Sequence, residues 1–268
     1  MSTRRMAAQA QRFLLPLLFI LCCCDGTRLG TEGCRPAAPR PPHRGTTDVT
    51  FLAFGDPQLD YRDPAPARKQ VTALNAAEGR ARWRHDGTRL TRIRGVVIAG
   101  DLTEHALDRE YRLFTSLFGL CGNKLLRHPV HEGYGNHDFT GKGSEPVVDS
   151  VSLRNPLRRD IVGTAPGRDG HYSWMWDNVH FVQLNLAPAD SLPPGRRGLD
   201  PRRALAFLRR DLAQNVRGTG RPVVLVCHYG FTRWEERSWW ARTGQAALLR
   251  AIRDYRVIAI LHGHHHGT

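Results

Sequence analysis

A polar turn follows directly on an apolar run in the stretch Ile93-Arg94-Gly95-Val96-Val97-Ile98-Ala99-Gly100-Asp101. The run is short and rich in β-branched residues, which predicts a buried strand. Gly100 permits a tight turn, so the strand would project Asp101 from its end. This stretch therefore predicts a strand that delivers a carboxylate to one edge of a sheet.

The same arrangement recurs on either side of this stretch. Apolar runs predict further strands at residues 49–54, 129–134, 223–226 and 257–261. Each run ends at or near a polar motif, and these motifs are Gly55-Asp56-Pro57-Gln58, Gly135-Asn136-His137-Asp138, Cys227-His228 and Gly263-His264-His265-His266. In open α/β sheets ligands gather beyond the carboxyl ends of the strands, so we expect the motifs to form one site.

Helical patterns separate most of the predicted strands. They predict helices at residues 67–84, 105–118, 201–216 and 240–254. Residues 171–176 and 179–186 predict a hairpin, whereas residues 140–170 are rich in Gly, Pro and Arg and are predicted as loops. The alternation predicts an α/β fold with two mixed sheets and helices outside, in one domain at residues 48–268.

The N-terminal region predicts export. Two arginines precede the apolar run at residues 13–21, which is the pattern of a secretory signal peptide at residues 1–24. Residues 25–47 are rich in Pro and Arg and are predicted to be a linker. A lipid on one of the cysteines at residues 22–24 would attach the protein to a membrane, so periplasmic, extracellular and lipid-anchored locations stay open. A buried N-terminal helix is the alternative.

The charge of the chain is strongly basic. Among 268 residues, 39 are Lys or Arg and 25 are Asp or Glu, which gives a formal net charge of +14. Nearly all the basic residues are arginines, and they are spread over the chain rather than gathered in one stripe. This favours a solvated arginine-rich surface, so no specific nucleic-acid partner is predicted, although a polyanion-binding face stays open.

The polar motifs together contain the ligands of a metal centre. Asp56 and Asp101 offer hard carboxylate oxygens, and Asn136 offers a neutral amide oxygen. Imidazole favours transition metals over Mg²⁺ or Ca²⁺, and the candidate imidazole ligands are His228, His264 and His266. Two divalent ions about 3.5–4 Å apart can hold a phosphate group and activate water. We therefore expect metal-assisted hydrolysis of a phosphate ester.

The ordered motifs resemble those of the calcineurin-like metallophosphoesterase superfamily. Its usual pattern is Asp-x-His, Gly-Asp-x-x-(Asp/Glu), Gly-Asn-His-(Asp/Glu), an isolated His and Gly-His-x-His, and the resemblance covers residues 49–266. It implies a four-layer αββα sandwich and hydrolysis of phosphate mono- or diesters by a metal-bound hydroxide. It also implies two divalent transition-metal ions, here Mn, Fe or Zn, and a phosphate-ester substrate.

The resemblance assigns the metal ligands. Asp56 and His266 would bind the first metal, and Asp101 would bridge both metals. The second metal would be bound by Asn136, His228 and His264. Gln58 stands where the family usually has a metal-binding His, and its amide oxygen is a weaker donor for a transition ion. A looser first site, which favours Mn or Fe over Zn, is therefore expected.

The resemblance also assigns residues beside the metals. His137 would be the general acid that protonates the leaving oxygen, and Asp138 would orient its ring. Glu104 would support the bridging region, and His262 is expected to stand behind the ligands without binding metal. The chain ends at Thr268, where relatives usually continue, which leaves open a minimal form or a product lacking C-terminal strands. The alternative function is a catalytically impaired metal-binding or scaffold protein of the same fold.

Overall fold

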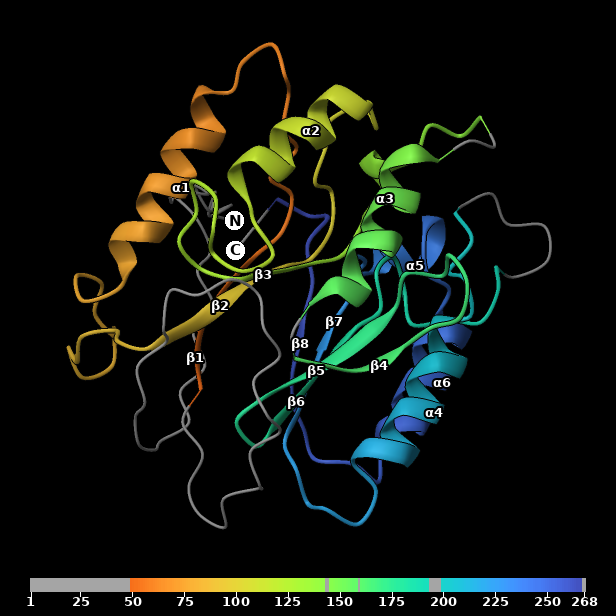
Figure 1. The fold of residues 1–268 in the computed structure, drawn as a ribbon. Coiled ribbons are helices and arrows are strands. Elements are labelled where there is room, and N and C mark those ends of the chain that lie inside the picture. The colour runs from red at the N-terminus through yellow and green to blue at the C-terminus, as the bar shows by residue number, and fades with distance from the viewer. Residues whose placement is uncertain (1–48, 143–144, 159, 193–198, 267–268) are drawn as a thin grey trace, which may run out of the picture.

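The computed structural model of the chain describes residues 49–142, 145–158, 160–192 and 199–266. They form two β-sheets with helices on the outside (Figure 1). The signal peptide and linker predicted at residues 1–24 and 25–47 lie outside the described residues, so both stay predictions. Within the described ranges, no helix has both the length and the apolar character needed to cross a membrane.

The first sheet contains three parallel strands, in the order β1 (Thr50–Phe54), β2 (Ile93–Ile98) and β3 (Val130–Glu132). Parallel neighbours need crossover connections. These connections contain the helices α1 (Ala65–Ala77) and α2 (Asp108–Leu117). The prediction of two mixed sheets is therefore wrong for this sheet, whereas the predicted α/β fold with two sheets is confirmed.

The second sheet has five strands, in the order β4 (Ile161–Thr164), β5 (Tyr172–Trp176), β6 (Val179–Gln183), β7 (Val223–Val226) and β8 (Val257–Leu261). The pairs β4–β5 and β5–β6 are antiparallel, and β5 and β6 form the predicted hairpin. The pairs β6–β7 and β7–β8 are parallel, so this sheet is mixed as predicted. The parallel crossovers contain α4 (Ala204–Asn215), α5 (Arg233–Ser238) and α6 (Arg242–Ile252).

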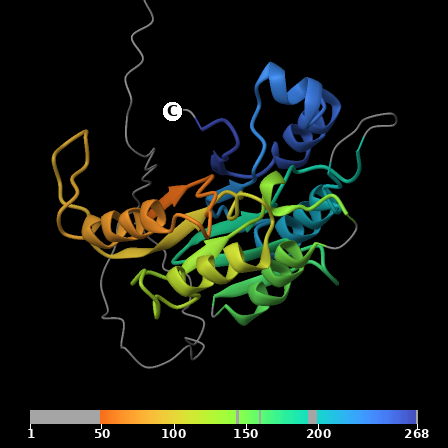
Figure 2. The same cartoon turned by 90° about the horizontal axis from the view of Figure 1, so that it is seen from above.

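Alternate residues of β1 face two different layers. Leu52 and Phe54 belong to the apolar cluster that includes the helices, whereas Phe51 belongs to a cluster shared by the two sheets. Between the sheets, the ring centroid of Phe181 lies 5.2 Å from that of Phe51 and 5.1 Å from that of Trp174. Helices α1 and α2 lie outside the first sheet, and α4 and α6 lie outside the second (Figures 1 and 2). The chain therefore has the expected αββα layers.

One helix and one strand occupy the stretch at residues 140–170 that is predicted as loops. Helix α3 (Pro146–Arg154) forms there, followed by a short 3-10 helix and then by strand β4. Val147 and Val151 are buried at helical spacing, and Pro146 lies in the first turn, where its missing N–H costs little. The surrounding Gly, Pro and Arg residues conceal this short apolar pattern. The 3-10 helix after α3 is η2 (Asn155–Leu157), and another, η1 (Asn136–Asp138), follows β3.

Helix α1 is shorter than predicted. It ends at Ala77 rather than at residue 84. Gly79 adopts a left-handed conformation with φ of 74°, which commonly ends a helix. Its N–H then donates to the carbonyl of Leu90, which starts the approach to β2.

A buried neutral histidine makes the fold sensitive to acid. The Nε2–H of His171 donates to the Arg202 carbonyl at 3.0 Å, and its Nδ1 accepts from Asn185 Nδ2 at 3.0 Å. The ring is 2% exposed, and burial lowers the pKa of His171 from 6.5 to about 4. The unfolded chain therefore binds a proton that the folded chain excludes between these two pH values.

We expect the stability due to His171 to be fully present above pH 6.5 and to be lost as the pH falls toward 4. The loss from this residue between pH 7 and pH 4 should be about 3 kcal/mol. The measurement is the free energy of chemical unfolding of the metal-free wild-type protein and of His171→Gln at both pH values. Between pH 7 and pH 4, the free energy of unfolding of the variant should fall by about 3 kcal/mol less than that of the wild type. Equal falls in both proteins would contradict the prediction.

Candidate metal centre

The polar motifs meet where the strands of the two sheets end. The Asp56 N–H donates to the Gly100 carbonyl at 3.1 Å, which joins the loops after β1 and β2. The Gly263 N–H donates to the His228 carbonyl at 3.1 Å, which joins the loops after β7 and β8. The His228 ring then donates to the Ala99 carbonyl at 2.8 Å and links the two pairs. These contacts between backbone groups, together with the His228 side chain, hold the four loops next to one another.

Asp101 lies at the centre of the site. It is 1% exposed, and its φ of 53° turns the chain sharply after β2. Its Oδ1 accepts the His137 N–H at 2.8 Å, and its Oδ2 lies 3.3 Å from His228 Nε2. Burial alone would raise the pKa of Asp101, but the hydrogen bond and charge of His228 hold it below its usual value. Asp101 is therefore a buried carboxylate that stays ionised at neutral pH.

Asp56 lies beside Asp101 and faces the last motif. Its two carboxylate oxygens accept the His264 N–H at 2.8 and 3.0 Å, and His266 Nε2 lies 3.6 Å from its Oδ1. Burial raises the pKa of Asp56, while the charge of His228 opposes the rise. Asp56 also takes a positive φ, 58°, so two left-handed aspartates follow the ends of neighbouring strands. Such backbone strain is commonly kept at functional sites.

His228 is oriented as a metal ligand requires. Its Nδ1 must donate to Ala99, because a carbonyl oxygen can only accept. Its Nε2 therefore faces Asn136 Oδ1 at 2.9 Å and Asp101 Oδ2 at 3.3 Å. Metal binding requires the neutral ring, which in this orientation would direct its Nε2 lone pair to the point that both oxygens face. A histidine fixed by its other nitrogen is the usual arrangement in metal sites.

Two groups of ligand atoms result, and they share Asp101. One group consists of Asp101, His228 and His264, and the other of Asp56, Asp101 and His266. Within each group all the ligand atoms lie within 4.8 Å of one another. Ligands about 2.0–2.2 Å from a common ion must lie this close together. The predicted ligands are thus brought together on both sides of the predicted bridging carboxylate.

The hydrogen bonding and the space around the Asp101 carboxylate also suit a bound cation. Within the described residues, its buried Oδ2 has no hydrogen bond of good geometry, although His228 Nε2 lies 3.3 Å away. A Cβ on Gly135 would press on Asp101 Oδ1, and a Cβ on Gly263 would lie 2.5 Å from Asp56 Oδ2. These glycines keep the space around both carboxylates open. The donor set of carboxylates, amide and imidazoles suits a divalent transition metal.

The backbone places the remaining predicted ligands close to this centre. Asn136 begins η1, and its Oδ1 contacts His228 as described. Gln58 has a positive φ of 38°, and its N–H donates to the Asp101 carbonyl at 2.9 Å. Metal binding by the Gln58 amide oxygen stays a prediction.

Glu104, rather than Asp138, holds the ring of His137. The Nδ1–H of His137 donates to the Glu104 carbonyl at 2.9 Å, and the Glu104 carboxylate lies 3.8 Å from the same nitrogen. The His137 side chain is 35% exposed, so its Nε2 can reach a substrate. The sequence does not show this contact, because it joins loops that follow two different strands.

The Asp138 carboxylate instead joins the loops that carry the candidate ligands, and these contacts do not support its predicted role in orienting the His137 ring. The carboxylate accepts the N–H groups of Leu102, Thr103 and Gly135 at 2.9–3.1 Å and the Thr103 hydroxyl at 2.8 Å. Burial, with the neighbouring Asp101 charge, raises the pKa of Asp138 to about 6. The contact made by Thr103 was not predicted from the sequence, although Thr103 lies within the motif Gly100-Asp101-Leu102-Thr103-Glu104.

Asp138→Ala should therefore lower the free energy of unfolding of the metal-free protein. Buried donors left without acceptors cost about 1–3 kcal/mol each, so we expect a loss of about 3 kcal/mol or more. Chemical denaturation of the variant measures this loss. Asp177→Asn is the control, since Asn tolerates the positive φ of 51° at this position and the change weakens only the partly exposed pair with Arg94, so stability should change by about 1 kcal/mol or less. If Asp138→Ala instead reduced turnover and left the free energy of unfolding unchanged, the predicted role of Asp138 in orienting the His137 ring would be supported.

The histidines in and just before the last motif lie in different surroundings. His262 is exposed and contacts the Gly263 carbonyl at 3.2 Å, so its position does not support the predicted place behind the ligands. His265 is also exposed, and its Nε2 lies 3.1 Å from the Thr232 hydroxyl. His264 packs among aromatic rings, with Trp234 stacked on it at 5.0 Å. Trp234 is 51% exposed, so it borders the open side of the centre.

This fold and donor set define a class, the metal-dependent hydrolases of phosphate esters. A family model described as calcineurin-like phosphoesterase matches residues 49–268, and the chain belongs to that family. The predicted family is therefore confirmed. A comparison with curated proteins found no match.

Proposed function

We propose that this protein hydrolyses phosphate mono- or diesters at a centre of two divalent metal ions. The observation that carries the proposal is the pair of ligand groups that share the buried carboxylate of Asp101. A single ion would need only one of these groups. An anion shared by two groups of imidazole and carboxylate ligands suits two cations.

The side chains would divide between two ions of Mn, Fe or Zn. Asp56 and His266 would hold one ion, with Gln58 at its edge. The other would be held by Asn136, His228 and His264. When bound, such ions polarise phosphoryl oxygens and make water more acidic. The protein supplies the fixed spacing of these ligands through the backbone contacts of the four loops.

His137 would protonate the leaving oxygen. Its Nδ1–H is committed to the Glu104 carbonyl, so the exchangeable proton is the one on Nε2. Its backbone N–H donates to Asp101, which fixes His137 relative to the proposed bridging ligand. A histidine that is partly exposed and fixed at one nitrogen is well placed to transfer a proton from the other.

The direct test is hydrolysis of p-nitrophenyl phosphate and bis-p-nitrophenyl phosphate by protein purified without a polyhistidine tag and supplied with Mn²⁺. We expect turnover that a chelator abolishes and added metal restores. The last motif offers a matched pair of variants. His264→Ala should lose at least about 100-fold, because even groups behind a metal ligand cost about 10–100-fold. His265→Ala should retain turnover.

Tight metal binding with no turnover of either ester would favour the alternative, a metal-binding or scaffold protein of the same fold. Gln58 motivates this alternative, since the family usually has a histidine there. Turnover that a chelator does not reduce would contradict both the metal-dependent hydrolase and the metal-binding scaffold. The relative rates with the two esters then decide between a monoesterase and a diesterase.

We also propose export, which rests on the sequence alone. The basic residues before the apolar run at residues 13–21 support it. N-terminal sequencing of protein expressed with its complete N-terminus should find removal of a segment close to residues 1–24. An intact N-terminus on protein retained inside the cell would contradict export.

A further inference from the structure

A fully buried carboxylate lies next to the loop that holds His137. The Glu110 side chain belongs to the first turn of α2 and is 0% exposed. Glutamates are rarely buried to this extent unless their oxygens have partners. Its Oε2 accepts the His105 N–H at 2.9 Å and the Leu107 N–H at 3.3 Å, and its Oε1 lies 3.0 Å from His105 Nδ1. Glu110 therefore fixes the segment between the motif that ends at Glu104 and the helix.

One peptide group joins Glu110 to the proposed general acid. The Glu104 carbonyl, which accepts the His137 Nδ1–H at 2.9 Å, belongs to the same peptide group as the His105 N–H. A peptide group is planar, so fixing its N–H also fixes the direction of its carbonyl. The Glu104 N–H is held in turn by the Leu59 carbonyl at 3.3 Å. A continuous set of hydrogen bonds thus runs from Glu110 to the His137 ring.

A strained turn in this segment depends on the same carboxylate. Ala106 is 1% exposed and has a left-handed φ of 55°, although it is not a glycine. This conformation is uncommon for residues with a Cβ and persists where the surroundings enforce it. The N–H groups of His105 and Leu107, which flank Ala106 along the chain, are the two that Glu110 Oε2 accepts. Loss of the carboxylate would release this turn and with it the Glu104 carbonyl.

Helix capping alone is the simpler role for Glu110. A glutamate at the third helical position commonly accepts the N–H of the residue before the helix, which is here Leu107. Capping does not account for the contact with the His105 N–H, which lies outside the helix and makes the shorter hydrogen bond. The two roles predict different results, because capping affects the stability of α2 whereas positioning affects proton transfer at His137.

We propose that Glu110 is a positioning residue for His137 and acts through the peptide group between Glu104 and His105. By fixing this carbonyl, Glu110 keeps the Nδ1–H of the ring bonded and leaves Nε2 to meet the leaving oxygen. This inference rests on the proposed function, because it takes His137 as the general acid. Glu110 belongs to neither group of candidate metal ligands, so its removal should leave bound Mn²⁺ unchanged.

Steady-state kinetics with Mn²⁺ test the proposal on an alkyl and a p-nitrophenyl ester of whichever class, mono- or diester, the wild-type protein hydrolyses. Glu110→Ala should lower kcat for the alkyl ester at least about tenfold, because a small misplacement of a reacting group can cost about 100-fold. The loss on the p-nitrophenyl ester should be about threefold or less, and KM should change by less than about twofold on both. Equal losses of kcat on the two esters would overturn the proposal.

Two further variants separate the position of the acceptor from charge and from folding. Glu110→Gln keeps an oxygen that can accept both backbone N–H groups, so its kcat should stay within about threefold of the wild type. A loss as large as that of Glu110→Ala would overturn the proposal. Glu110→Met fills the same space without an acceptor, so it should reproduce the selective loss on the alkyl ester even if Glu110→Ala does not fold. Equal losses of Glu110→Met on both esters would also overturn it.

A double-mutant cycle with His137→Ala separates positioning from helix capping. In the His137→Ala background, Glu110→Ala should lower kcat for the alkyl ester by less than about twofold, because the group that it positions is absent. A loss as large as that in the wild-type background would assign Glu110 to the stability of α2 and overturn the proposal.

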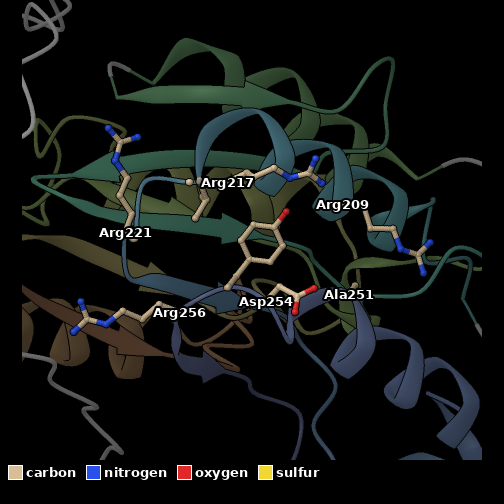
Figure 3. A pocket seen from close by; sticks show the side chains of 10 residues that line it. Arg209, Arg217, Arg221, Ala251, Asp254 and Arg256 are labelled. Atoms are coloured by element: carbon tan, nitrogen blue, oxygen red, sulfur yellow. The ribbon is translucent and has the colours of Figure 1, made fainter.

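Asp190→Ala is the matched control for loss of a carboxylate at the start of a helix. Asp190 Oδ1 accepts the Ala206 N–H at 2.6 Å, in the first turn of α4, and its Oδ2 pairs with Arg209 at 3.2 Å. Arg209 also borders a cavity of about 550 Å³ where β7 and β8 begin, at the opposite end of these strands from the candidate metal ligands (Figure 3). Asp190 is thus tied to α4 rather than to the loops around His137, so kcat should stay within about twofold on both esters. A selective loss on the alkyl ester equal to that of Glu110→Ala would overturn the proposal.

The hydrogen bond of His137 can also be measured without turnover. In ¹H–¹⁵N spectra of the metal-free wild-type protein, the His137 Nδ1–H should give a resonance that is absent from His137→Ala. The resonance should persist in Glu110→Gln and disappear from Glu110→Ala, because loss of the fixed carbonyl opens this N–H to exchange with water. An unchanged resonance in Glu110→Ala, or none in the wild type, would overturn the proposal. Absence of wild-type turnover on either class of ester would contradict the proposed function, and this spectrum would still decide whether Glu110 positions the ring.

Discussion

Asp101→Asn is expected to lower kcat/KM for p-nitrophenyl esters by about 10³-fold or more. The substitution removes the charge shared by the two ligand groups, and metal-based stabilisation of several kcal/mol corresponds to about this factor. Bound Mn²⁺ should fall in parallel. Asn keeps an oxygen that can accept the His137 N–H, so the metal-free variant should remain folded. Steady-state kinetics and metal analysis of the same preparations check both effects.

Asp108→Asn is the matched control for this prediction. Asp108 is exposed, and its carboxylate pairs with Arg112 on the surface of α2. This change should leave turnover and metal content unaltered. If Asp101→Asn retained full activity with two bound ions, Asp101 would not be the shared ligand.

His137→Ala is expected to reduce turnover by about 10²–10⁴-fold on esters with alkyl leaving groups, which need a proton as they depart. The loss should be about tenfold or less with p-nitrophenol, a better leaving group that departs with little help. Metal content should not change, because His137 contributes no ligand atom to either group. Comparison of kcat across a series of phosphate esters measures the difference.

His105→Ala provides the control for the loss of an imidazole near the site. His105 is half-exposed, and its ring pairs with Glu110 at 3.0 Å rather than with any of the candidate metal ligands. It should retain turnover on every ester. Equal losses for His137→Ala on good and poor leaving groups would assign His137 to binding rather than to proton transfer.

The strands and the candidate ligand residues that follow them were recognisable in the sequence because each is a local pattern. Runs such as residues 49–54 and 93–99 are mostly apolar, with Thr50, Arg94 and Gly95 as the exceptions, as expected for strands that are largely buried on both faces. Each is followed at once by a glycine and an aspartate. The order of the motifs along the chain then identified the family without any knowledge of their distances.

The contacts between loops were not predictable in the same way. Asp138 accepts the Leu102 N–H across 36 positions of sequence, and His137 donates to Glu104 across 33. Neighbouring positions therefore gave the wrong partner for the His137 ring. Helix α3 was missed for a different reason, since only a few buried valines distinguish it from the surrounding Gly, Pro and Arg residues. The all-parallel first sheet follows from its helical crossovers, which the local patterns do not orient.

The most direct test of the two-metal centre is titration of the metal-free protein with Mn²⁺, with bound metal and hydrolysis of bis-p-nitrophenyl phosphate and p-nitrophenyl phosphate measured in the same samples. The shared position of Asp101 predicts that turnover rises with added Mn²⁺ and reaches its plateau at two bound ions per chain. A plateau at one bound ion, or two bound ions with no turnover of either ester, would contradict a two-metal phosphoesterase.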